Sequence, residues 1–118
     1  MSGTKTAIEI AQKKTCERYQ AGFVEAAGLV NSGFAIETDG LQPIHGLRHN
    51  VTGDTTGWYI WCGAEFSTDK DFFKPIHTAH IYEKHPEIAE LLGLPPGYRF
   101  LVAGDHLDVW FDSGLLQS

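Results

Sequence analysis

The clearest alternation of hydrophobic and polar positions lies near the end of the chain, in residues 98–103 and 106–111. Gly104 and Asp105 between these segments fit a two-residue hairpin loop. In that register the opposing residues on one face are all apolar: Tyr98 with Phe111, Phe100 with Val109, and Val102 with Leu107. A slip by one residue would place Asp108 opposite an apolar side chain and destroy the pattern. The pattern therefore predicts a β-hairpin.

The opposite face of this hairpin carries a strip of one aromatic and three charged residues. They are Arg99, Asp108, Trp110 and Asp112. The register places Arg99 opposite Trp110, which allows a cation–π contact. A large aromatic side chain between carboxylates is typical of an interface anchor with a charged rim. Alternatively, a helix covers this face and Trp110 belongs to the core, where most large aromatic side chains lie.

Residues 57–63 (GWYIWCG) give the strongest signal for a single strand, because aromatic and β-branched residues stand between glycines. Alternation puts Trp58, Ile60 and Cys62 on one face. It puts Tyr59 and Trp61 on the other. A strand that is apolar on both sides is usually central and covered on both faces. We therefore expect this strand in the middle of a sheet.

The N-terminal segment predicts a helix over residues 6–21. Thr6 and Glu9 fit a capping box, and the apolar positions that follow recur at helical spacing. Gly22 is placed to end the helix, because glycine adopts the left-handed conformation of a helix stop without strain.

Further elements are predicted around the central strand. Residues 23–36 predict one or two short strands, and residues 41–51 predict a further strand in which Pro43 argues for a sheet edge. Residues 75–84 predict a helix with a proline in its first turn. Residues 86–92 predict a second short helix, also begun by a proline and followed by a glycine that can stop it.

These elements predict one α+β domain over residues 1–118, in which the N-terminal helix and the central helical pair pack on a small, mainly antiparallel sheet. A chain of this length buries one core without covalent cross-links. Cys16 and Cys62 lie in different elements and no secretory signal precedes them, so we expect two free, buried thiols. The same lack of a signal favours a cytoplasmic location.

The net charge of −6 lies entirely in the second part of the chain. Residues 1–50 hold equal numbers of basic and acidic side chains, whereas residues 51–118 hold four basic and ten acidic ones. This excess disfavours nucleic acid and anionic membranes as partners, because both are polyanionic. It favours a basic protein partner, although many cytosolic proteins are mildly acidic for solubility alone.

Two alternatives assign chemistry to other residues. The first is a small metal-binding or hydrolytic domain that uses His77 and His80, which lie three positions apart in the predicted 75–84 helix and would present two nitrogens to one metal ion. The spacing does not fix a third ligand, for which Glu83 and His45 are candidates.

A small-molecule pocket between the sheet and the helical pair is the second alternative, with Tyr59, Trp61 and Phe73 as its lining. The chain contains no phosphate-binding loop, nucleophile elbow or zinc-protease motif. We therefore expect no catalytic residues and no cofactor.

The second half of the chain also contains four distinctive blocks. They are residues 57–61 (GWYIW), 71–77 (DFFKPIH), 92–101 (LGLPPGYRFL) and 108–112 (DVWFD). Together they resemble the bacterial immunity protein 33 family over residues 57–112. The resemblance implies neutralisation of a cognate bacterial toxin and supplies no catalytic residues. Combined with the acidic second half, it predicts a non-catalytic protein that binds a basic toxin through the hairpin strip.

Overall fold

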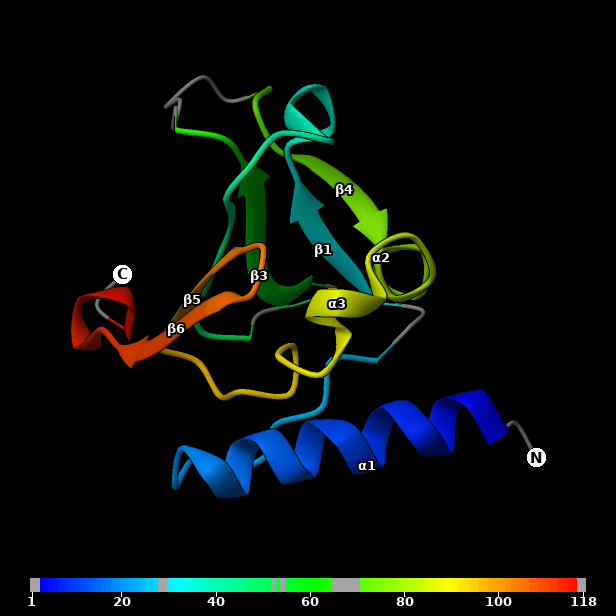
Figure 1. The fold of residues 1–118 in the computed structure, drawn as a ribbon, viewed down its shortest axis with the longest axis vertical. Helices are drawn as coiled ribbons and strands as arrows, with labels where there is room; N and C mark the ends of the chain where they lie inside the picture. Colours follow the sequence, from blue (N-terminus) through cyan, green and yellow to red (C-terminus); the bar gives the residue numbers. More distant parts are fainter. Residues whose placement is uncertain (1–2, 28–29, 52, 54, 65–70, 117–118) are drawn as a thin grey trace.

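The computed structural model describes residues 3–27, 30–51, 53, 55–64 and 71–116, which form an α+β fold (Figure 1). Within these ranges the helices are α1 (Gly3–Arg18), α2 (Thr78–Lys84) and α3 (Pro86–Ala89), with 3-10 turns η1 (Ile36–Thr38) and η2 (Ser113–Leu116). The strands are β1 (Asn31–Phe34), β2 (Ile44–Arg48), β3 (Thr55–Cys62), β4 (Lys74–His77), β5 (Tyr98–Ala103) and β6 (His106–Phe111). No helix in the described part of the chain has the length and hydropathy needed to span a membrane.

In the described ranges, six strands form one sheet in the order β4-β1-β3-β2-β5-β6. β1 and β3 run parallel, and all other neighbouring strands are antiparallel, which confirms the mainly antiparallel sheet. β3 lies in the interior between β1 and β2, as its apolar residues on both faces predict. Figure 1 shows β4 and the β5–β6 hairpin at opposite ends of the sheet.

The larger core lies between the helices and one face of the sheet, which we call the inner face. Trp58 and Ile60 from β3 are fully buried there against Ile88 and Leu92. The indole nitrogen of Trp58 donates a hydrogen bond of 2.9 Å to the carbonyl of Leu92, so the largest core side chain has its polar atom satisfied. The opposite face of the sheet, which we call the outer face, carries a smaller cluster that includes Trp61.

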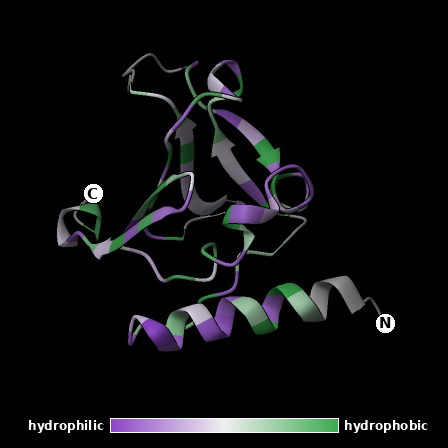
Figure 2. Ribbon diagram, in the orientation of Figure 1, coloured by the Kyte–Doolittle hydropathy of each residue, from purple (hydrophilic) through white to green (hydrophobic). Residues whose placement is uncertain are grey.

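α1 runs along the base of the molecule, below α3 (Figure 1). Its buried residues Gln12 and Cys16 donate hydrogen bonds to the carbonyls of Ala89 (3.0 Å) and Gly93 (3.3 Å). A Cβ at Gly93 would lie 2.8 Å from Cβ of Gln12, so glycine permits this close approach rather than a left-handed helix stop. Figure 2 shows hydrophobic and hydrophilic positions interleaved along α1, as expected for a helix exposed on one side.

α1 (Gly3–Arg18) begins and ends earlier than predicted, so the capping box does not lie at its start. Gln20, with φ 55°, occupies the left-handed position after the helix. The backbone N–H groups of Gln20 and Ala21 donate to carbonyls of the last turn (3.1 and 2.8 Å), the bonding of a Schellman motif. Gln20 therefore takes the role that the sequence assigned to Gly22.

Two predictions that relied on prolines are wrong. Residues 74–77 form the edge strand β4, with Pro75 inside it, and the helix predicted from 75 begins at Thr78. An edge strand tolerates proline because one of its sides needs no hydrogen-bond donor. Pro43 precedes β2, which lies in the interior between β3 and β5 rather than at an edge. Among the described residues of the 23–36 segment, only those in β1 form a strand.

Arg48, at the end of β2, is a fully buried cation. Its guanidinium donates hydrogen bonds to backbone carbonyls: those of Thr56 (2.8 Å), Val24 (2.8 Å), Leu94 (2.7 Å), Glu25 (3.1 Å) and Leu92 (3.5 Å). Burial lowers the pKa of Arg48 to about 10, which leaves the side chain charged at neutral pH. Arg48 thus ties the segment after α1 and the segment after α3 to the sheet.

Candidate interaction surface

The β5–β6 hairpin has the predicted register, with Gly104 and Asp105 as its loop. Phe100 is buried in the main core, and Tyr98, Val102, Leu107 and Val109 pack against the same core. The apolar face of the hairpin is therefore part of the inner face. Consequently the strip of Arg99, Asp108, Trp110 and Asp112 lies on the outer face, at the end of the sheet.

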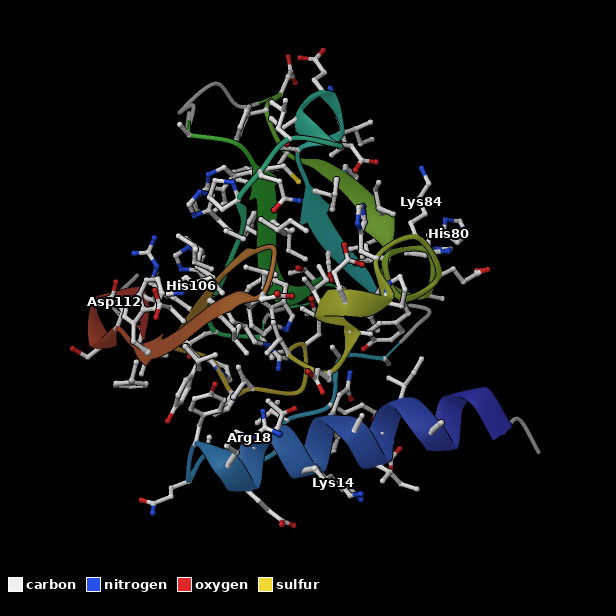
Figure 3. The ribbon with its side chains drawn as sticks, viewed as in Figure 1. Lys14, Arg18, His80, Lys84, His106 and Asp112 are labelled. Carbon is white, nitrogen blue, oxygen red and sulfur yellow. The ribbon has the colours of Figure 1, made fainter. Side chains whose placement is uncertain are left out.

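Asp108 and Trp110 of the strip are exposed, Arg99 and Asp112 are partly buried, and Arg99 contacts both Trp110 and Asp112. The guanidinium carbon of Arg99 lies 5.6 Å from the ring centroid of Trp110, which confirms the expected cation–π contact. Nη1 of Arg99 also donates a hydrogen bond of 3.1 Å to Oδ2 of Asp112. Trp110 remains 41% exposed, so the alternative that places it in the core is wrong. Figure 3 shows Asp112 on the hairpin side of the molecule, far from His80 on α2.

The carboxylates of the strip have partners within the molecule. Oδ2 of Asp108 lies 2.9 Å from Nε2 of the neighbouring His106, and both side chains are exposed. Asp112 is paired with Arg99. Two carboxylates and one guanidinium leave a single negative charge in excess when His106 is neutral. Because exposed ion pairs contribute little free energy, the aromatic ring of Trp110 is the strongest potential anchor of the strip.

The register of the sheet extends this strip across two interior strands. The two rows that result on the outer face are Trp110–Arg99–Leu47–Tyr59 and Asp108–Leu101–His45–Trp61. β2 and β3 supply the residues of these rows that lie toward the middle of the sheet. The position of β2 and β3 beside β5 is set by pairing between segments far apart in the sequence. Leu47 and Trp61 are buried in the smaller cluster, so within these rows only the partly exposed His45 and Tyr59 extend the accessible surface beyond the hairpin. The sequence predicted the strip but not this contribution of His45.

His45 lies in the middle of the second row. Its ring stacks on Trp61 with the centroids 4.8 Å apart and an interplanar angle of 13°. Nε2 of His45 lies 3.0 Å from the carbonyl oxygen of Gly63, so it carries the proton and donates. Burial lowers the pKa of His45; the hydrogen bond to Gly63 opposes this shift, and the nearby Arg99 adds to it. His45 therefore favours its neutral form in the folded protein.

The two candidate metal ligands lie in different elements of the structure. His77 is the last residue of β4 and His80 lies in α2, so the two do not share a helical face as predicted. Their ring centroids are nevertheless 5.9 Å apart. Across the described ranges, no group of three or more His, Cys, Asp or Glu side chains is arranged to hold a metal ion. Neither Glu83 nor His45 thus completes a site with this pair.

The predicted small-molecule pocket is also in the wrong place. Tyr59, Trp61 and Phe73 do cluster, with Phe73 in edge contact with Tyr59 (5.2 Å) and with Trp61 (6.1 Å) between ring centroids. This cluster lies on the outer face, however, whereas α2 and α3 cover the inner face. These three residues therefore do not line a space between the sheet and the helical pair.

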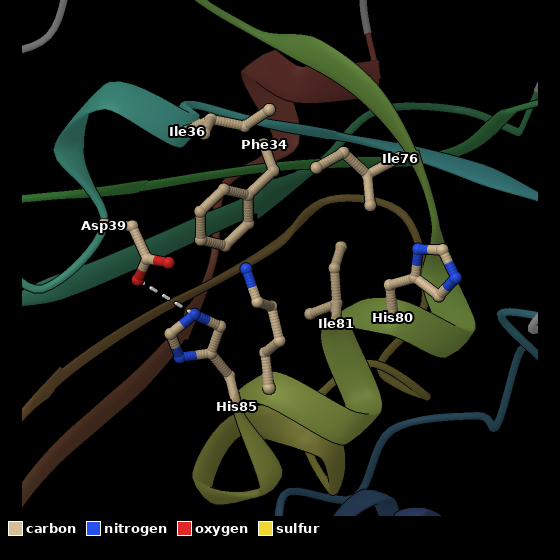
Figure 4. A pocket seen from close by; sticks show the side chains of 8 residues that line it. Phe34, Ile36, Asp39, Ile76, His80, Ile81 and His85 are labelled. Atoms are coloured by element: carbon tan, nitrogen blue, oxygen red, sulfur yellow. Dashed lines mark ion pairs between the residues drawn. The ribbon is translucent and has the colours of Figure 1, made fainter.

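A pocket of about 80 Å³ lies instead between α2 and the strands β1 and β4 (Figure 4). Phe34, Ile76 and Ile81 form its apolar lining. At its rim the ring of His85 stacks on Phe34 (5.4 Å between centroids), and Nε2 of His85 lies 3.1 Å from Oδ1 of Asp39. Binding sites for small molecules usually enclose roughly 300–1,000 Å³, so this pocket has room for one short side chain at most.

The two cysteines are free and buried, as expected. Burial raises the pKa of both the Cys16 and the Cys62 thiol. Both thiols are therefore protonated at neutral pH and are poor nucleophiles. Cys16 on α1 and Cys62 on β3 are both part of the main core rather than of a reactive site.

A comparison with families of known proteins extends the match seen in the sequence. The sequence model of a family described as Imm33-like domain matches residues 11–112 of this chain. The matched range takes in the second half of α1 and all six strands of the described sheet. No curated protein and no solved structure shows significant similarity to the chain.

Proposed function

Because the chain belongs to the Imm33-like domain family, we propose that it is an immunity protein that binds a cognate bacterial toxin and neutralises it without catalysing a reaction. The family assignment supports a toxin as the partner in general. The binding mode and the cytoplasmic location are our own extension. A cytoplasmic immunity protein would bind the toxin in the compartment where the toxin is synthesised. The two free thiols would stay reduced there.

The observation that carries the binding mode is the exposed indole of Trp110. The residue is 41% exposed, its ring contacts the guanidinium of Arg99, and it lies on the edge strand β6 on the outer face. Binding energy in protein interfaces is concentrated in such aromatic anchors, while polar groups around them exclude water. Trp110 therefore inserts into an apolar recess of the toxin, with the charged residues of the strip at the rim.

The charge of the chain supports a toxin with a basic surface. Asp108 and Asp112 flank Trp110, and Asp105 adds a third carboxylate at the tip of the hairpin. Lysine or arginine side chains of a toxin would meet these groups at the rim of the contact. Complementary charges at a rim mainly raise the rate of association and select the partner.

Trp110→Ala tests this proposal in a binding assay with a toxin domain that the unaltered protein binds. We expect the dissociation constant to rise about 30-fold, because an aromatic hot spot contributes at least about 2 kcal/mol. Ile10→Ala is the matched control, since Ile10 is a large, exposed apolar residue on α1, away from the hairpin. The control variant should bind like the unaltered protein, and both variants should retain their circular dichroism spectra.

Two outcomes would contradict the proposal at different levels. If the unaltered protein forms no complex with the toxin and does not protect cells that express it, the immunity function is wrong. If the complex forms and Trp110→Ala binds as tightly as the unaltered protein, the function stands and the strip is not the contact surface.

A further inference from the structure

The two edges of the sheet differ in how they are protected against pairing with another strand. β4, at one edge, has four residues and includes Lys74 and Pro75, both of which discourage strand addition. β6, at the other edge, has six residues, no proline and no lysine, and it pairs with β5 without a bulge. In the described part of the chain, β6 has a strand neighbour on one side only. The β4 edge is therefore protected against the addition of another strand, whereas the β6 edge is not.

The hairpin register shows which backbone groups of β6 point outward. Ala103 and His106 flank a two-residue loop, so they form a hydrogen-bonded pair, and every second residue of β6 after His106 also bonds to β5. The intervening residues Leu107, Val109 and Phe111 direct their N–H and C=O groups away from β5. The side chain of Phe111 is 51% exposed beside this edge.

The sequence of β6 is complementary to itself when two copies run antiparallel. With Val109 on the two-fold axis, the outward groups of all three residues pair, giving six backbone hydrogen bonds. Leu107 then faces Phe111 of the second copy. On the outer face Asp108 faces Trp110, and His106 faces Asp112. Each pair occurs twice because the axis repeats it.

Charge selects this register over its neighbours. If the axis lay at Asp108, the two copies of Asp108 would stand directly opposite each other. If the axis lay at Trp110, Asp108 would oppose Asp112. Like charges directly opposite destabilise an antiparallel pair, whereas the axis at Val109 opposes no two carboxylates and places the imidazole of His106 against Asp112.

From this complementarity we infer that β6 is a homodimerisation edge, through which two copies of the chain join their sheets into one continuous sheet of twelve strands across the described ranges. The occupant of the edge is a second copy because its own β6 supplies the apolar, charged and hydrogen-bonding partners that the edge requires. The inference does not rest on the proposed function. The outer face remains open in such a dimer, which would display two copies of Trp110 near the axis.

The test is sedimentation velocity of the isolated protein over a range of concentrations. We expect a monomer–dimer equilibrium, with dissociation in the micromolar range because one strand edge is a small interface. His106→Lys should tighten the dimer and His106→Glu should weaken it, each by about fivefold, since the residue faces Asp112 of the second copy twice. His106 is exposed, so neither change threatens the fold.

Two further variants test the register itself. Val109→Cys should form an intermolecular disulfide under mild oxidation, because hydrogen-bonded pairs hold their Cα atoms about 5.5 Å apart. Ile10→Cys, on the exposed side of α1, should not. Val109→Pro removes the central outward N–H without touching the bonds to β5, and it should yield a folded monomer.

The inference is overturned if the unaltered protein stays monomeric at high concentration, or if a dimer forms that neither His106→Glu nor Val109→Pro weakens. A monomeric protein whose toxin binding is lost in Val109→Pro would show that the toxin occupies the edge. That result would reject self-pairing while leaving the immunity function intact.

Discussion

At the scale of single residues, Arg48 is the side chain on which the packing around β2 depends most. Arg48→Lys should lower the free energy of unfolding by about 3 kcal/mol, because an ammonium cannot reach all the carbonyls that the guanidinium satisfies and leaves them buried without donors. Urea denaturation measures this loss. Arg18→Lys, on the exposed side of α1, is the control and should stay within about 0.5 kcal/mol. An equally small loss in Arg48→Lys would show that its carbonyl contacts contribute little.

His45 links stability to pH. Burial lowers its pKa in the folded state below the ordinary 6.5. Below pH 6.5 the unfolded chain therefore binds more protons than the folded protein, and folding stability falls until the pH reaches the lowered pKa. The slope contributed by one such group is at most about 1.4 kcal/mol per pH unit.

His45→Gln isolates this contribution, because glutamine can still donate to the carbonyl of Gly63 but does not titrate. As the pH falls below 6.5, the unaltered protein should lose stability faster than His45→Gln in urea denaturation. Ile10→Ala, an exposed change on α1 that removes no titratable group, is the control and should keep the steeper dependence. Parallel curves for the unaltered protein and His45→Gln would contradict the assigned role of His45.

At the scale of elements, the sequence predicts what is decided locally and fails where distant segments decide. The β5–β6 hairpin is predictable residue by residue because its loop and its apolar pattern lie within one short segment. Pro75 misleads because a proline suits both the first turn of a helix and an edge strand. The strip on the hairpin is predictable for the same local reason, whereas its continuation to the partly exposed His45 depends on β2 pairing with β5.

The pairing of β2 with β5 depends on a glycine. A Cβ at Gly46 would lie 2.3 Å from the ring of Phe100, which fills the space above β2 in the core. Gly46→Ala should therefore cost about 1–3 kcal/mol in unfolding free energy, and the same change should cost less when Phe100→Leu is already present. Gly22→Ala is the control, because a Cβ at Gly22 would meet nothing within 4 Å. Independent, additive effects at Gly46 and Phe100 would show that the two residues do not share this space.

At the scale of the whole molecule, the two faces of the sheet have different tasks. The inner face carries the main core under the helices, and the outer face carries the strip and the rows that continue it. The net charge of −6 belongs to the half of the chain that contains β3 to β6. In the proposed complex the long-range attraction of a basic toxin is thus a property of the whole chain, and the close contact is a property of Trp110.

This division predicts separate effects on the two rate constants of toxin binding. Raising the salt concentration from about 0.05 to 0.5 M should slow association at least about tenfold, because it screens the attraction between oppositely charged proteins, and should change dissociation little. Trp110→Ala should do the reverse, since loss of a buried anchor speeds dissociation. Asp105→Asn, an exposed change at the hairpin tip, should slow association slightly and leave dissociation unaltered. Surface plasmon resonance with immobilised toxin measures both constants. An association rate that is independent of salt would mean that the toxin surface is not basic, whatever Trp110→Ala does to dissociation.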